Sequence, residues 1–239
     1  MNAYNLFRDS GSYLALNLDP RDENPNQCGR QAPAITIARQ TGARGITICT
    51  RLHCKLQEKD AKDPLRWTLF DSELSKEILK QHNLPEHLEK FIPEDAVSEF
   101  QATVNEMLGR HPSLWTLFED TKKTVAHLAN IGHCILVGRG GNHIAGHLHN
   151  VLNVRLIGST NKRLQYVTNN LQISESEAAA LIKRDDHARR AYVKQHFHCD
   201  IDDPFNYDLV INTDRLSDEA VVDQIITALG QLNASPAVV

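Results

Sequence analysis

Residues 34–52 read AITIARQTGARGITICTRL, and the rest of the chain can be arranged around this stretch. It opens with apolar, β-branched residues and passes into a loop in which Gly42 and Gly45 stand three positions apart. From Ile48 onward, apolar residues recur every four positions, as on the buried side of a helix. A strand, a glycine loop and a helix in this order direct backbone N–H groups toward an anion, commonly a phosphate. The stretch therefore predicts a phosphate-binding loop.

This loop differs from the common phosphate loop, in which Lys-Ser/Thr follows the last glycine. Gly45 stands where the lysine would be and Ile46 where the hydroxyl residue would be, while Arg44 comes one position early and Thr47 one late. Either could substitute through a shift of register, in which case the Arg44 guanidinium should point into the concave side of the loop. The alternative is a glycine loop that binds phosphate poorly or not at all.

Composition places the chain among globular intracellular proteins. Its 239 residues suffice for one large α/β domain or two small ones, and 41% of them are hydrophobic. A net charge of −4 indicates neither nucleic acid nor an anionic membrane as a partner. We find no apolar run of ~20 residues that would span a membrane and no recognisable signal segment. Five cysteines without CxxC spacing fit reduced thiols. We expect a cytoplasmic protein.

Five apolar runs alternate with helical patterns along the chain, which is typical of βαβ units. The continuous run 134–137 suits a strand buried on both faces of a parallel sheet. We therefore predict an α/β fold with a doubly wound, five-stranded parallel sheet and helices on both of its faces. The predicted strands are 34–38, 67–71, 134–137, 153–157 and 207–211.

The remaining segments predict the domain organisation. Residues 1–33 are expected to form a poorly ordered arm, and residues 34–239 the folded domain, with an inserted helical region at 72–132. Predicted helix caps are Gly132 at a C-terminus, Ser159 and Ser217 at N-termini, and the capping box Ser174 to Glu177.

Five motifs stand out along the chain. They are ITIARQTG at 35–42, LFDSEL at 69–74, ILVGRGGN at 135–142, KRDD at 183–186 with Arg189, Arg190 and Tyr192, and NYDLVINT at 206–213. In this order and at these spacings, they resemble the cytidylate-kinase-like proteins of the P-loop nucleoside-monophosphate kinase superfamily. The resemblance covers roughly residues 34–230. It implies a P-loop NTPase-like fold and ATP-dependent phosphoryl transfer to a nucleoside monophosphate, with a cytidylate-like acceptor and magnesium carried by the nucleotide.

The resemblance assigns the donor nucleotide to the glycine loop. Gly42 and Gly45 would allow close approach of the backbone and supply the positive φ that such a loop needs. The residues expected to bind the donor phosphates are Arg39, Gly42, Arg44, Gly45 and Thr47.

Two residues at the ends of predicted strands are candidates for the acceptor. Arg139 follows the apolar run 134–137, and its planar fork matches phosphate oxygens. Cytidylate kinases resemble this sequence but have an aspartate after that arginine, where Gly140 stands here, so the identity of the acceptor stays open. Asp71 could orient the acceptor or hold magnesium through water, or could cap the helix expected from Glu73. The alternative for Arg139 is a solvent-exposed loop residue without a binding role.

The basic segment at 183–199 resembles the lid of such kinases, which closes over the transferring phosphoryl group. We predict Arg184, Arg189 and Arg190 as catalytic residues. The alternative is a solvated helix surface, on which Asp185 and Arg189 at i, i+4 would form an ion pair.

Three function classes follow from these patterns. The first is a nucleotide kinase, the second is a catalytically degenerate protein of the same fold that binds a nucleotide or phosphorylated ligand, and the third is an interaction scaffold with an empty pocket. The twelve histidines have no paired metal-site spacing, so we expect no protein-held metal. The arm or the helical region could support a homo-oligomer.

Overall fold

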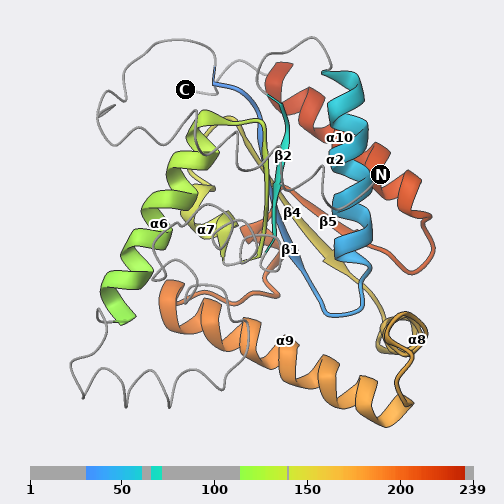
Figure 1. The fold of residues 1–239 in the computed structure, drawn as a ribbon. Coiled ribbons are helices and arrows are strands. Elements are labelled where there is room, and N and C mark those ends of the chain that lie inside the picture. The colour runs from blue at the N-terminus through green and yellow to red at the C-terminus, as the bar shows by residue number, and fades with distance from the viewer. Residues whose placement is uncertain (1–30, 61–65, 72–113, 139, 235–239) are drawn as a thin grey trace, which may run out of the picture.

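A computed structural model describes residues 31–60, 66–71, 114–138 and 140–234, and these contain a five-stranded parallel sheet between two layers of helices (Figure 1). The strand order is β2-β3-β1-β4-β5, so the strand that leads into the glycine loop lies at the centre. Every pair of neighbouring strands is parallel. The strands are β1 Ala34–Arg39, β2 Thr68–Phe70, β3 Cys134–Val137, β4 Val151–Ile157 and β5 Leu209–Asn212.

Helices cover both faces of the sheet, as Figure 1 shows. Two of them, α2 and α10, pack together on one face, and α6 and α7 pack on the other, whereas α9 crosses beyond the carboxyl ends of the strands. The helices are α2 Gly45–Lys59, α6 Leu114–Ile131, α7 Gly141–Ala145, α8 Thr160–Leu171, α9 Glu175–Phe197 and α10 Asp218–Ala234, with a 3₁₀ turn η1 at Pro204–Asn206.

The predicted fold class is confirmed, and the five strands lie where the apolar runs predicted them, with no end shifted by more than two residues. Of the predicted helical region 72–132, residues 72–113 lie outside the described residues, as do residues 1–30 of the predicted arm. In the described part of the chain, no helix is long and apolar enough to cross a membrane.

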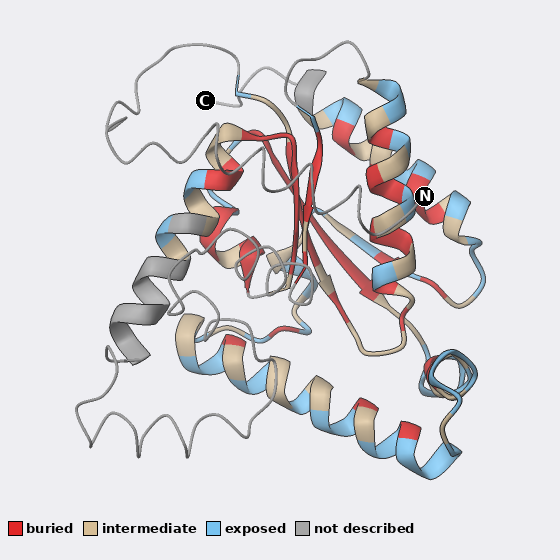
Figure 2. Cartoon of the chain, in the orientation of Figure 1, coloured by how far each residue is buried: buried red, intermediate tan, exposed pale blue. Residues whose placement is uncertain are grey.

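Alternation along β1 explains why helices pack on both faces. Successive side chains of a strand point to opposite faces. Ile35 and Ile37 join the core beneath α2 and α10, while Ala34 joins a second cluster beneath α6 and α7. All three are at most 1% exposed. Figure 2 shows buried residues concentrated in the sheet and on the inner sides of these helices.

Helix ends follow the predicted caps. The Ser174 hydroxyl accepts the Glu177 N–H, and the Glu177 carboxylate accepts the Ser174 N–H, which completes the capping box. Ser159 and Ser217 cap α8 and α10. The basic segment at 183–199, which resembles a kinase lid, lies mostly on the same helix as the capping box, since α9 runs unbroken for 23 residues.

The chain order places a ligand crevice at the centre of the sheet. The connection after β1 leads to α2 on one face, and the connection after the neighbouring β3 leads to α7 on the other. Loops that diverge from adjacent parallel strands leave a crevice at the carboxyl ends of those strands. The glycine loop therefore lies at the position where α/β sheets bind ligands.

Replacing Ile35 by alanine should lower the free energy of unfolding by about 2–5 kcal/mol, because the side chain is fully buried in the central strand. Ile46→Ala is the matched control, since that side chain is 60% exposed, and we expect a change within about 0.5 kcal/mol. Urea unfolding of both variants measures the difference, and equal losses would contradict the core position of β1.

Candidate phosphate site

The loop between β1 and α2 makes its turn with one glycine and one arginine. Gly42 has φ +82° and Arg44 has φ +59°, and α2 begins at Gly45. The prediction that both glycines supply positive φ is therefore wrong for Gly45, because the second left-handed residue is Arg44. Gly45 instead packs closely against β1, since a Cβ there would lie 3.0 Å from Cγ of Arg39.

Gly42 lets helix α8 approach the loop. A Cβ at this position would lie 2.7 Å from the carbonyl oxygen of Arg163, too close for any other residue without movement of the backbone. The Arg163 guanidinium continues this contact by donating to the carbonyl oxygen of Thr41 at 3.0 Å. The loop is therefore clamped against α8.

Backbone donors converge where the loop enters α2. The N-cap is Arg44, and among the described residues no side chain caps this helix. The first N–H groups of a helix have no partner within it and carry partial positive charge, so they favour an anion. One loop donor is already used: the Thr41 N–H donates to the Asp186 carboxylate of α9 at 2.8 Å.

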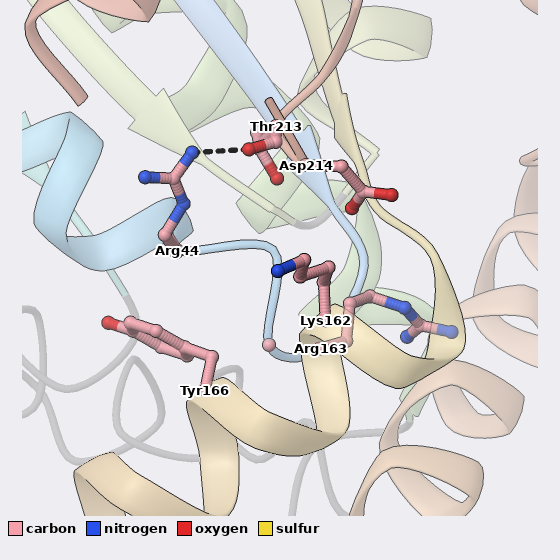
Figure 3. A pocket seen from close by; sticks show the side chains of 7 residues that line it. Arg44, Lys162, Arg163, Tyr166, Thr213 and Asp214 are labelled. Atoms are coloured by element: carbon pink, nitrogen blue, oxygen red, sulfur yellow. Dashed lines mark hydrogen bonds between the residues drawn. The ribbon is translucent and has the colours of Figure 1, made fainter. Parts of the chain in front are cut away.

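The Arg44 guanidinium points away from the concave side of the loop. It donates to the Asp218 carboxylate at 2.7 Å and to the carbonyl oxygens of Thr213 and Leu216 at 2.5 and 2.7 Å, all in the turn from β5 into α10 (Figure 3). The expectation that Arg44 would occupy the place of the missing lysine is therefore not met by this conformation. Its charge ties the loop to the start of α10.

A pocket of about 190 Å³ opens beside the loop. Lys162 reaches from α8 alongside the loop, toward the space between Arg44 and Tyr166 (Figure 3). The Tyr166 hydroxyl is 2.9 Å from the hydroxyl of Thr47, which fixes the ring against α2. The lining residues are Gly42, Arg44, Lys162, Arg163, Tyr166, Thr213 and Asp214. Such a pocket can hold part of a nucleotide.

Helix α9 brings the predicted lid arginines to the same edge of the sheet. Arg189 donates to the hydroxyl of Thr41 and lies 3.7 Å from the Asp186 carboxylate. Arg190 donates to the Asp202 carboxylate at 2.7 Å. Arg184 lines neither of the two pockets beside the loop; its side chain is 56% exposed and donates to the adjacent Asp185. The structure thus brings Arg189 to the glycine loop and Arg190 to the second of these pockets, while Arg184 lines neither.

A second, small cavity lies between α9 and the carboxyl ends of β1 and β4. Four arginines from three elements contribute to it, together with two carboxylates. Its lining is Arg39, Gln40, Arg155, Asp186, Arg189, Arg190, Ile201 and Asp202.

The two residues predicted to contact the acceptor are Asp71 and Arg139. Asp71 is buried and lies 3.5 Å from the Arg39 guanidinium, and Arg139 lies outside the described residues.

Several residues of these sites were given no role from the sequence, among them Arg155, Lys162, Arg163 and Asp202, and Asp186 was noted only as part of the KRDD motif. Arg155 gave a signal, because a charged residue stood inside an apolar strand and was predicted only as part of that strand. No signal marked Lys162, Arg163 or Asp202, because each stands among polar residues. The partners of Arg163 and Asp202 are also distant in sequence.

The loop after β3 packs tightly under the end of α9. Gly140 has φ +65°, and a Cβ there would lie 2.4 Å from the Phe197 ring. The same ring stacks on His143 with centroids 5.0 Å apart. An aspartate at position 140 could therefore not be accommodated without moving Phe197, so the glycine is a packing requirement.

One cysteine, Cys49, is buried in helix α2, which follows the glycine loop. Burial raises the pKa of the Cys49 thiol to about 12, so it stays protonated at neutral pH. No group of three or more His, Cys, Asp or Glu side chains in the described ranges is placed to hold a metal ion.

Comparisons with known proteins bear on this site. The model of the cytidylate kinase-like family matches residues 34–215. A uronate isomerase from Corynebacterium glutamicum is 29% identical over 92 residues, which make up 38% of this chain and 18% of that protein, so the chain spans less than a fifth of the isomerase. An uncharacterized protein from Eubacterium ventriosum has a similar structure, with a TM-score of 0.57 at 18% identity over 83% of this chain and 98% of that chain. At this identity, the similarity shows the fold alone.

Stability should depend on pH through His143. Burial lowers the pKa of this histidine below its ordinary value of 6.5, so the unfolded chain binds the proton more readily. Stability should therefore fall as the pH drops below about 6.5, until the folded pKa is passed. Urea unfolding between about pH 7.5 and pH 5 should show a smaller loss for His143→Phe than for the parent. His149→Gln, at an exposed site, is the control, and an unchanged slope in His143→Phe would contradict the prediction.

Proposed function

Because the chain belongs to the cytidylate kinase-like family, we propose that it transfers the terminal phosphoryl group of ATP to a nucleoside monophosphate, with cytidylate-like acceptors the first to test. One observation carries the proposal: α9 lies on the glycine loop, where Asp186 and Arg189 contact Thr41. Phosphates held by the loop would therefore lie beside the arginines of α9. Such transfer requires positioning and charge stabilisation rather than a covalent intermediate.

The donor would occupy the pocket beside the loop. The N–H groups at the start of α2 would hold its phosphates, and the Lys162 ammonium, which reaches along the loop from α8, would supply the charge that the loop's own sequence lacks. A phosphate on the Thr41 N–H would replace the Asp186 carboxylate that it binds here. Magnesium would arrive with the nucleotide, since it needs few protein ligands.

The arginines of the second cavity would face the transferring group. Arg189 and Arg190 come from α9 and Arg39 from β1, so guanidinium groups would approach from more than one side. Charge developing on the phosphoryl oxygens would be stabilised without reorganisation of solvent. Arg139 and Asp71 are proposed to contact the acceptor, and Gly140 leaves the acceptor base without a carboxylate partner at that position.

A second candidate is a protein of the same fold that binds nucleotide without turnover. Two contacts favour it: Asp186 occupies the Thr41 N–H, and Arg44 is bound to the turn before α10. The two candidates differ in turnover alone. Thermal unfolding with ATP–magnesium and a panel of nucleoside monophosphates detects binding, since a ligand of the folded state raises Tm. ADP release that depends on one monophosphate supports the kinase; a shift without release supports the binder; no shift contradicts both.

Arg189→Gln should lower kcat by about 10²–10³-fold with little change in Tm, because it removes one donor aimed at the developing charge. Lys194→Gln is the matched control, since Lys194 is exposed on the same helix. ADP-release kinetics at saturating nucleotide measure both variants. Equal rates for the two variants would exclude a catalytic role for Arg189.

Lys162→Gln should weaken ATP binding by about 10–100-fold, because a charged donor to phosphate contributes about 1.5–3 kcal/mol. Lys59→Gln removes an exposed lysine at the far end of α2 and should leave binding unchanged. Isothermal titration of ATP–magnesium gives both dissociation constants. Unchanged affinity in Lys162→Gln would place the donor phosphates elsewhere.

A further inference from the structure

The small cavity under α9 has the charge of an anion site. Four guanidinium groups line it against two carboxylates, those of Asp186 and Asp202, and a third carboxylate, that of Asp71, pairs with Arg39 from outside the lining. Guanidinium groups in one place repel each other, and burial makes the repulsion stronger, so such a cluster is stable only around negative charge. Its members come from β1, β4 and α9, which means that the fold, and not a local run of sequence, assembles the cluster.

Arg155 is the most firmly placed member of this cluster. It stands in β4, its side chain is only 5% exposed, and its guanidinium lies over the Tyr207 ring at 5.5 Å. One terminal nitrogen, Nη2, donates to the Asp202 carboxylate at 2.6 Å. A buried arginine on a central strand cannot move out to solvent as the arginines of an exposed helix can.

The other terminal nitrogen of Arg155 is buried with no hydrogen-bond partner among the described residues. Leaving a buried charged donor without an acceptor costs free energy, and such groups are rare unless something else satisfies them. Because Arg155 lines the cavity, an anion held there could accept this bond.

Asp202 occupies the position that such an anion would take. Its two carboxylate oxygens accept from Arg155 and Arg190, at 2.6 and 2.7 Å. Burial by itself would raise the pKa of Asp202, but the hydrogen bond from Arg190 and the charge of Arg155 outweigh it, so the group is ionised at neutral pH. Its side chain is 40% exposed and stands in the connection between α9 and β5, so it can leave more easily than Arg155.

We propose that Arg155 is the fixed anchor of a second phosphate-binding subsite in this cavity, and that the Asp202 carboxylate fills the subsite until a phosphate replaces it. The free volume of about 10 Å³ holds one water molecule, so a phosphate enters only when Asp202 moves away. The planar fork of Arg155 then binds phosphate oxygens with both terminal nitrogens.

The identity of this phosphate depends on the proposed function. If the protein is a nucleotide kinase, the subsite holds the phosphate of the acceptor nucleotide, since the pocket proposed for the donor shares no lining residue with this cavity. The binding of a phosphate dianion by Arg155 does not itself require catalysis.

The competing explanation is that Arg155 serves structure alone, by holding the connection between α9 and β5 through Asp202. The two explanations differ for Asp202→Asn. A purely structural pair loses stability and gains no ligand, whereas a subsite that has lost its internal carboxylate binds an external phosphate more tightly.

The test is isothermal titration of inorganic phosphate, CMP and cytidine into the full chain and three variants. Arg155→Gln should weaken binding of phosphate and CMP by about tenfold or more, and Asp202→Asn should tighten it. Arg66→Gln is the matched control, because Arg66 is exposed and precedes β2, at the opposite edge of the sheet. Cytidine, which has no phosphate, should be insensitive to all three changes. Comparing phosphate with CMP shows whether the free anion or the nucleotide phosphate is preferred.

Three results would overturn the proposal: parental affinity in Arg155→Gln, weakened affinity in Asp202→Asn, or no binding of phosphate or CMP at millimolar concentration to either the parent or Asp202→Asn. If Arg155→Gln does not fold, the direction of change in Asp202→Asn decides alone. Phosphate binding that depends on Arg155, without ADP release, would support this subsite while contradicting the kinase.

Discussion

The carboxylate of Asp186 joins the three elements on which the site depends. It accepts the Thr41 N–H of the glycine loop and, from α8, the Arg163 guanidinium, at 2.8 and 2.6 Å. Because Asp186 belongs to α9, these two bonds hold the long helix against the glycine loop and α8 at the carboxyl ends of the strands. Arg189 reaches Thr41 from the next turn of the same helix. A phosphate on the loop would compete for the same donors, so ligand binding and the placement of α9 are coupled.

Charge balance governs the rest of this edge. Three arginines here are at most 8% exposed, and each is paired with an aspartate. The pairs are Arg39–Asp71, Arg155–Asp202 and Arg163–Asp186. Buried charges need such partners, because removal from water costs more than an isolated ion can recover. An aspartate near an arginine is also the nearest protein equivalent of a phosphate. The edge is therefore stable without ligand and is chemically suited to exchange carboxylate for phosphate.

Packing, rather than charge, shapes the side of the site after β3. Gly140 is required there because the Phe197 ring fills the space that a side chain would need. Since Phe197 is the last residue of α9, the end of this helix packs directly on the loop after β3. The Phe197 ring thus fills the space that an aspartate at position 140, as in cytidylate kinases, would need. Under the proposed function, the acceptor would be recognised by other groups.

Local sequence was sufficient for the elements and for several of their ends. Apolar runs located all five strands, and serines located the starts of α8, α9 and α10, because periodicity and capping are decided within a few residues. The glycine loop was located for the same reason, although Arg44, not Gly45, takes the second left-handed position. Pattern alone also separated the parallel sheet from other classes, since strands alternated with helices.

The direction of each charged side chain was decided only by the tertiary structure. Arg44 bonds to a segment about 170 residues later in the chain, and Asp186 accepts a bond from a loop 145 residues earlier. Arg155 forms an ion pair with Asp202, which lies 47 residues away. No local pattern contains these partners, because an ion pair depends on where the folded chain brings two groups together. The sequence by itself thus determined the sheet, its order of elements and a loop suited to phosphate. Packing between distant segments decided which cations surround that loop and which carboxylates pair with them. The physical reason is that burying an unpaired charge costs more free energy than the fold can recover.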